Sequence, residues 1–158
     1  MKIRTTLLPG DLSFLISSHT EYYSRELGYT EKFEYYVAKS AVEFYEAYVP
    51  NRSRIWIVED EKGQRLASLV LQERGLEAQL RYFLILPEFQ GKGLGRKLLN
   101  QFMAFAREKG YLSSYLWTTE EQEVAVQLYE SFGYRMVEEL PSSTVGKPLI
   151  ERKYELVF

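Results

Sequence analysis

Residues 84–99 read LILPEFQGKGLGRKLL, where an apolar run meets a helix-like segment across alternating glycines at Gly91, Gly93 and Gly95. Glycine costs a helix or strand about 0.5–1 kcal/mol relative to alanine. Such a cluster therefore predicts a backbone that something approaches closely. A helix that starts here would present free N–H groups and the positive end of its dipole, and phosphate is the ligand we expect.

Other interpretations compete for the same glycines. The Walker A pattern G-x-x-x-x-G-K-[ST] cannot be drawn here, which excludes ATP hydrolysis. The dinucleotide fingerprint needs glycine where Arg96 stands, although Glu120 could serve as its ribose-binding acid. A plain turn between a strand and a helix also remains open. The neighbouring elements must decide between these interpretations.

Composition limits the class of protein. The chain has 158 residues, of which 46% are hydrophobic, so we predict a single domain over residues 1–158 with a packed core. A net charge of −2 argues against nucleic acid as a partner. The lack of cysteine excludes disulfides and thiolate metal sites, and we predict no metal. No apolar stretch approaches membrane-spanning length, so we expect a cytoplasmic protein without a membrane partner.

The predicted elements follow the order of an α/β protein with a mixed sheet. Apolar periodicity and capping signals predict helices over residues 12–27, 31–49, 95–109 and 121–132. Alternation and turn signals predict strands over residues 1–8, 54–60, 65–73, 78–86, 113–119, 134–139 and 150–158. Thr118 and Glu121 fit a capping box for the last helix. We expect a mostly antiparallel central sheet flanked by about four helices.

A family resemblance explains the glycines. Residues 90–95, QGKGLG, match Q/R-x-x-G-x-G/A, the acetyl-CoA motif of the GNAT superfamily of N-acetyltransferases, and the order of elements resembles that family over nearly the whole chain. More narrowly, GDLSFLISSHTEYYSRELGY, FEYYVAKS, LWTT and LYESFGY resemble the acetyltransferase half of fusion proteins with a MarR-type DNA-binding domain. We do not expect that DNA-binding domain here. The resemblance implies the GNAT fold and an acetyl-CoA-dependent N-acetyltransferase.

The resemblance also implies how acetyl-CoA binds. Backbone N–H groups of the glycine loop would wrap the pyrophosphate, and the end of the preceding strand would pair with the pantetheine amides, as the physics of helix N-termini and strand addition allows. That strand and strand 113–119 would run parallel and splay apart. Gln122 stands where many members have an asparagine that contacts the cofactor arm. The implied cofactor-binding residues are Leu84, Ile85, Leu86, Gln90, Gly91, Lys92, Gly93, Leu94, Gly95, Arg96 and Gln122.

The chemistry narrows the catalytic candidates. Direct attack of an amine on a thioester in a ternary complex needs a neutral amine, a stabilised oxyanion and a proton for the departing thiolate. The resemblance assigns that proton to Tyr129. A packing role is the alternative, because Ala125, Tyr129 and Phe132 share one helical face. A non-catalytic acyl-CoA-binding or interaction module with the same fold is the alternative function.

The acceptor side is less defined. Many family members place a glutamate on the strand before the motif, but residues 78–86 contain none. Arg81 within that strand needs a carboxylate partner, either from the chain or from a substrate, and we expect one from the chain. His19, Tyr23 and Glu26 follow helical spacing in a region that borders the acceptor site in relatives, although packing would also explain His19. A small amine, an amino acid, an antibiotic and a peptide amine all remain open, as does a homodimer.

Overall fold

The computed structural model describes all 158 residues. Its strands are β1 (Lys2–Arg4), β2 (Arg54–Glu59), β3 (Arg65–Arg74), β4 (Glu77–Ile85), β5 (Ser113–Thr119), β6 (Arg135–Ser142) and β7 (Leu149–Val157). Its helices are α1 (Asp11–Leu27), α2 (Glu31–Glu46), the 3-10 turn η1 (Pro87–Phe89), α3 (Leu94–Glu108) and α4 (Glu123–Ser131). This is the predicted order of elements. None of the helices combines the length and the apolar character needed to cross a membrane.

All seven strands form one sheet, in the order β1-β2-β3-β4-β5-β7-β6. Every neighbouring pair is antiparallel except β4 and β5, which are parallel and are joined through α3. The last strand, β7, lies between β5 and β6. The prediction of a mixed, mostly antiparallel sheet is confirmed.

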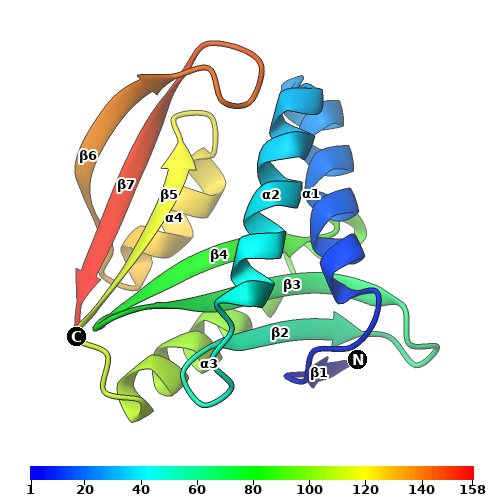
Figure 1. Ribbon diagram of the computed structural model, residues 1–158, viewed down its shortest axis with the longest axis vertical. Helices are drawn as coiled ribbons and strands as arrows, with labels where there is room; N and C mark the ends of the chain where they lie inside the picture. The colour runs from blue at the N-terminus through cyan, green and yellow to red at the C-terminus, as the bar shows by residue number, and fades with distance from the viewer.

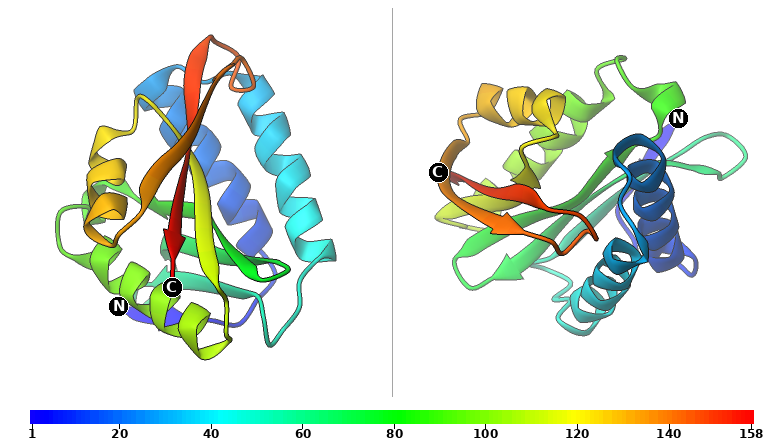
Figure 2. Two further views of the ribbon diagram at one scale, coloured as in Figure 1. Left: turned by 90° about the vertical axis from the view of Figure 1, so that its left-hand side faces the viewer. Right: turned by 90° about the horizontal axis from the view of Figure 1, so that it is seen from above.

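Two helical layers enclose the sheet, with α1 and α2 on one face and α3 and α4 on the other (Figure 2). The largest core cluster packs α3 and α4 on the sheet around Trp56, which is fully buried. The predicted apolar face of α3 is buried there: Leu98, Leu99, Phe102, Phe105 and Ala106. On the other face, Leu15 of α1 and Phe44 of α2 pack on β2 and β3.

The parallel strands β4 and β5 separate soon after they begin. They pair only where Glu77–Gln79 face Ser113–Tyr115. Figure 1 shows the two strands starting side by side near the C-terminus and then diverging, with α4 behind β5 and α1 and α2 across from it. The predicted splay is confirmed. Beyond Gln79, the edge of β4 that faces β5 has no strand partner.

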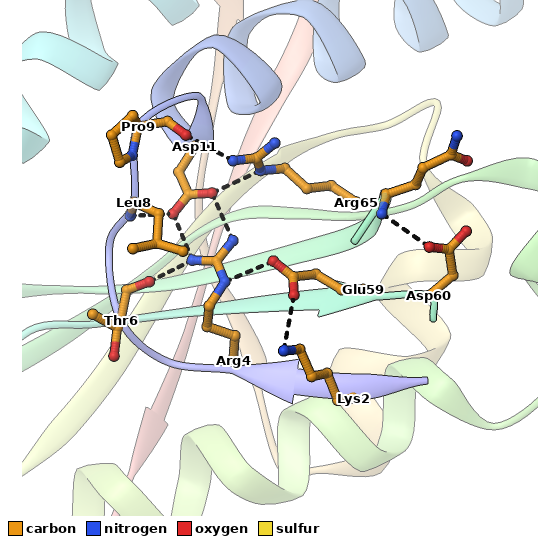
Figure 3. Close-up of polar contacts among 10 residues, drawn as sticks. Lys2, Arg4, Thr6, Leu8, Pro9, Asp11, Glu59, Asp60 and Arg65 are labelled. Carbon is orange, nitrogen blue, oxygen red and sulfur yellow. Dashed lines mark hydrogen bonds and ion pairs between the residues drawn. The ribbon is translucent and has the colours of Figure 1, made fainter. Parts of the chain in front are cut away.

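A buried ionic cluster fixes the start of the chain (Figure 3). The carboxylate of Asp11 is fully buried and accepts hydrogen bonds from Arg4, from Arg65 at 2.7 Å and from the Leu8 N–H. Arg4 also pairs with Glu59 at 2.7 Å. Burial disfavours the charge on Asp11, but these hydrogen bonds outweigh that effect and lower its pKa. The cluster thereby ties β1 and the first turn of α1 to β2 and β3.

Candidate functional site

A cavity opens where β4 and β5 diverge, between these strands and the helices α1, α2 and α4. Its volume of about 150 Å³ resembles that of an engineered cavity that binds benzene. Five of the predicted site residues line it: His19, Tyr23, Arg81, Gln122 and Tyr129. Glu26 does not line it, because its exposed side chain forms an ion pair with Arg25 at 3.2 Å. The candidate site is therefore a small cavity at the point where β4 and β5 diverge, which we call the fork of the sheet.

A β-bulge shapes the β4 wall of this cavity. The register of β3 and β4 shifts between Ser68 and Val70, and Tyr82 takes the left-handed conformation with φ of 50°. A positive φ is rare for tyrosine. Ser68 Oγ donates to the Tyr82 carbonyl at 2.7 Å, and Ser40 Oγ lies 2.5 Å from the Tyr82 hydroxyl. These contacts hold the bulge where it places Tyr82 on the cavity wall.

The glycine cluster lies beyond the free end of β4, and its glycines serve two purposes. Gly91 and Gly93 have φ of 74° and 81°, and an added Cβ at either would meet nothing within 4 Å. These two glycines allow the left-handed turns and leave open space above the loop. Gly95 has an ordinary conformation, but its Cβ would lie 3.2 Å from Leu128 and 3.4 Å from Ile85. This third glycine lets α3 pack closely on β4 and α4.

Helix α3 begins at this loop without a side-chain cap. The N–H groups of its first turn therefore have no partner within the helix. The Gln90 side chain donates to the Ile85 carbonyl at 2.7 Å and ties the loop to the end of β4. Arg96 donates to Ser131 Oγ at 3.1 Å, while Lys92 is exposed beside the Phe89 ring. The loop therefore offers a ligand both its backbone N–H groups and the exposed cation of Lys92, while Arg96 is held by Ser131.

Tyr129 reaches the cavity from α4 and is buried, with 6% of its surface exposed. Its ring packs between Phe83 and Tyr134, with centroids 6.1 and 6.0 Å away. No protein group forms a hydrogen bond with its hydroxyl, whereas the hydroxyl of Tyr134 lies 2.7 Å from Ser114 Oγ. Burial, with smaller effects of neighbouring tyrosines, raises the pKa of Tyr129 well above its ordinary value. The hydroxyl is therefore protonated and free to donate.

The side chains of Tyr23 and Gln122 meet across the cavity. The Tyr23 hydroxyl donates to Gln122 Oε1 at 3.3 Å, which joins α1 to the N-terminus of α4. The Tyr23 ring stacks on Tyr29 at 5.6 Å, and burial raises the pKa of Tyr23 above its ordinary range. Gln122 lies on the side of the fork where the predicted cofactor arm would pass.

His19 forms part of the cavity wall but is not suited to accept a proton. Its Nδ1 donates to the Leu15 carbonyl at 2.8 Å, and its Nε2 is fully buried without a partner. Burial lowers the pKa of His19 to about 4, although the hydrogen bond to Leu15 opposes this shift. A neutral imidazole packed against the Tyr82 ring at 5.7 Å fits the packing interpretation of this residue.

Arg81 differs from its prediction. A carboxylate partner within the chain was the expected one, and this is wrong, because no carboxylate lies within ion-pair distance of Arg81. Its Nη1 donates instead to the buried amide oxygen of Gln72 at 2.9 Å. The guanidinium thus reaches the cavity without a negative partner.

The cavity lining also includes residues that were not among the predicted site residues, and one predicted helix cap is wrong. Trp117 is 38% exposed and lines the cavity with Glu151 of β7. Strict alternation in strand 113–119 could have placed Trp117 opposite the buried Leu116. The capping box is wrong, because Thr118 Oγ1 has no hydrogen-bond partner and α4 begins at Glu123. Thr119 Oγ1 accepts instead from the Glu121 N–H.

Comparisons with known proteins agree with this geometry. Residues 15–134 match the model of the acetyltransferase (GNAT) family. The uncharacterized N-acetyltransferase YjgM of Escherichia coli (strain K12) is 36% identical over 121 residues, which cover 73% of this chain and 71% of that protein.

Solved structures show the same fold. A ribosomal-protein-alanine N-acetyltransferase from Brucella melitensis has a TM-score of 0.77 at 16% identity and covers 100% of both chains. A mutant of spermidine N-acetyltransferase SpeG from Vibrio cholerae has a TM-score of 0.71 at 23% identity, covering 99% of this chain and 95% of that one.

Proposed function

The chain is an N-acetyltransferase that belongs to the acetyltransferase (GNAT) family, and on that premise we propose that it transfers the acetyl group of acetyl-CoA directly to an amine. Acetyl-CoA supplies the activated thioester when bound. In this reaction a C–N bond forms as the C–S bond breaks. The amine loses one proton, and the departing sulfur takes one up. The residues around the fork of the sheet determine where each part binds and where each proton goes.

The glycine loop and the free edge of β4 fit the two polar parts of CoA. The open space at Gly91 and Gly93, next to the unpaired N–H groups of α3, suits a pyrophosphate. We assign pyrophosphate binding to the backbone of residues 90–96. The unpaired edge of β4 near Leu84–Leu86 suits the pantetheine amides as an added strand. Gln90 already satisfies the Ile85 carbonyl, so pairing at that oxygen requires the Gln90 side chain to move or share it.

We assign the proton for the sulfur to Tyr129. Its hydroxyl has no protein partner, lies in the cavity wall and is protonated because burial raises its pKa. The same burial disfavours an uncompensated thiolate, which raises the affinity of the sulfur for a proton. Donation from Tyr129 moves the negative charge from the sulfur to the phenolic oxygen, and the proton that the amine releases to water in the cavity can return to Tyr129 and restore its neutral hydroxyl.

The amine proton leaves by a different route. His19 is a weak base in this structure, since its pKa is about 4. The strand β4 contributes no carboxylate to the cavity, and Glu151 of β7 is the one carboxylate in its lining. We infer that the amine loses its proton to water in the cavity, with Glu151 as the side chain that can receive it.

The observation that carries the proposal is the coincidence of three features at one fork: an unpaired strand edge, an open glycine loop and a free tyrosine hydroxyl. Isothermal calorimetry with acetyl-CoA tests it. We expect saturable one-site binding, and at least about tenfold weaker binding of S-acetylpantetheine, which lacks the pyrophosphate. Equal affinities would contradict the role of the glycine loop, and no binding at millimolar acetyl-CoA would contradict the proposal itself.

Within the family, we propose that the chain is similar to the acetyltransferase half of MarR-type fusion proteins. We likewise propose that residues 1–158 form one domain. Size-exclusion chromatography with light scattering would determine whether the chain forms the homodimer that the sequence leaves open.

A further inference from the structure

The cavity carries one guanidinium, and its charge is not neutralised by the protein. Arg81 is half-buried on β4 and has no carboxylate within ion-pair distance. Elsewhere in this chain, the partly buried side chains of Arg4 and Arg65 each pair with Asp11, at 2.8 and 2.7 Å. A half-buried cation is stabilised when a carboxylate completes its hydrogen bonds. Arg52 and Arg54 are also half-buried without a carboxylate partner, but they do not line the cavity, so Arg81 is the one unpaired arginine at the site.

Neighbouring residues fix the position of the guanidinium. Its Nη1 donates to Oε1 of Gln72, which is only 2% exposed, and its Cζ lies 5.0 Å from the Tyr82 ring centroid. An arginine has five N–H donors arranged in a rigid fork. The bond to Gln72 uses one of these donors. The others have no protein partner and are sufficient to bind both oxygens of a carboxylate. Tyr82 belongs to the bulge of β4, so Arg81 is held directly beside the fork.

The charged side chains that line the cavity favour an acceptor that carries a carboxylate as well as an amine. The cavity lining contains one cation, Arg81 on β4, and one carboxylate, Glu151 on β7, and these two side chains are not paired with each other. Strand β5 lies between β4 and β7. A polyamine would bring several positive charges against Arg81 with only one carboxylate to balance them. A small molecule with both an amine and a carboxylate places one negative charge where the protein has a free positive one.

We propose that the acetyl acceptor is a small amine that also carries a carboxylate, and that Arg81 binds this carboxylate. The proposal rests on the proposed function, because it names the second substrate of the same site. The cavity of about 150 Å³ has room for an amino acid or a similar molecule. Arg81 in this role is a substrate-binding residue that sets specificity. It takes no part in the proton transfers.

Matched substrates test the carboxylate directly. Initial rates are measured with amino acids and with the corresponding amino acid amides, which differ only by replacing the carboxylate with a neutral carboxamide. We expect the wild-type chain to favour the carboxylate over the carboxamide by about 10- to 150-fold in kcat/KM, the range of a hydrogen bond to a charged group. Arg81→Met should lose most of this preference, because its kcat/KM for the amino acid should fall much further than its kcat/KM for the amide.

Two further variants control for indirect effects. Arg81→Lys keeps the charge but not the fork, so it should retain only part of the preference. Arg74 is a matched control, because its Nε donates to the buried Gln79 amide at 2.9 Å but its side chain does not line the cavity. Arg74→Met should keep the full preference. The melting temperature of each variant shows whether it remains folded, and its acetyl-CoA dissociation constant shows whether it still binds the cofactor.

Several outcomes would overturn the proposal. It is wrong if the wild type shows no preference for the carboxylate, if the preference survives in Arg81→Met, or if polyamines are the better acceptors. A chain that acetylates no amine contradicts the proposed function, and the carboxylate site is then tested by calorimetry. N-acetylated amino acids should bind the CoA-saturated chain, and Arg81→Met should weaken this binding by about 10- to 150-fold. Equal binding to both chains would reject the site independently of turnover.

Discussion

Replacing Tyr129 by phenylalanine removes the hydroxyl but keeps the ring, so it distinguishes a catalytic role of Tyr129 from a packing role. The hydroxyl has no hydrogen-bond partner in the protein, so its removal breaks no contact that stabilises the fold. We expect a free energy of unfolding within about 0.5 kcal/mol of the wild type, which is typical of changes without a named mechanism. If Tyr129 donates the proton to the departing sulfur, kcat should fall by about 10²–10⁴-fold, the usual contribution of general acid catalysis.

Tyr134 offers a matched control in the same cluster. Its ring lies 6.0 Å from that of Tyr129, but its hydroxyl shares a buried hydrogen bond with Ser114 at 2.7 Å. Tyr134→Phe leaves the Ser114 hydroxyl without this partner, at a cost of about 1–3 kcal/mol. For a domain of this size, each kcal/mol lowers Tm by about 2–4 °C. We therefore expect Tyr134→Phe to lose stability and keep kcat, the reverse of the expectation for Tyr129→Phe.

The assay combines steady-state kinetics with a working amine, acetyl-CoA titration and thermal melting for both variants. Acetyl-CoA affinity should stay within about threefold for Tyr129→Phe, since neither the glycine loop nor the β4 edge changes. The role of Tyr129 as proton donor is refuted if kcat of Tyr129→Phe stays within about threefold of the wild type, because general acid catalysis contributes far more than that. It is also refuted if Tyr134→Phe loses as much kcat, because the effect would then come from packing.

Three further predictions concern the glycine loop, His19 and the buried ionic cluster. Gly93→Ala and Gly110→Ala carry similar strain, of about 1–2 kcal/mol, because φ is 81° and 77° and each added Cβ meets open space. Only Gly93→Ala should weaken acetyl-CoA binding, by about tenfold or more, as measured by calorimetry. His19 binds protons more readily unfolded, so stability should fall as pH drops from 6.5 to about 4, by at most about 3 kcal/mol. His19→Phe should lack that loss in urea melts; an unchanged pH profile would contradict the assignment. Asp11→Asn should destabilise by about 3–5 kcal/mol, and Glu26→Gln, in an exposed pair, by less than about 0.5 kcal/mol; equal effects would refute the buried cluster's role.

Features that depend on local sequence were predictable. The apolar face of α3 follows from the helical period, and Gly28 ends α1 in the left-handed conformation that its position predicts. Thr30, a residue type favoured at helix N-termini, caps α2 with its side chain accepting from the Lys32 N–H. The glycine loop was predictable because Gly91 and Gly93 both require positive φ. In each case the signal lies within a few residues of the feature.

Features that depend on contacts between distant strands were not predictable. The bulge at Tyr82 has no local signal, since tyrosine rarely adopts a positive φ and the contacts that hold it come from β3 and α2. Glu151 reaches the cavity only through the register of β7 on β5. The partner of Arg81 proved to be Gln72, because a neighbouring strand offers an amide where a carboxylate was expected. These contacts form only when the sheet is assembled.

We propose that this chain transfers acetyl groups from acetyl-CoA to amines where β4 and β5 diverge. The most direct measurement incubates the purified chain with acetyl-CoA and a panel of amines that includes amino acids, simple alkylamines, polyamines and peptides. Release of the CoA thiol and the mass of each amine are followed together. We expect one equivalent of thiol for each acetylated amine, with Tyr129→Phe reducing both. Acetyl-CoA that binds without an acetylated product on any amine of the panel would contradict it.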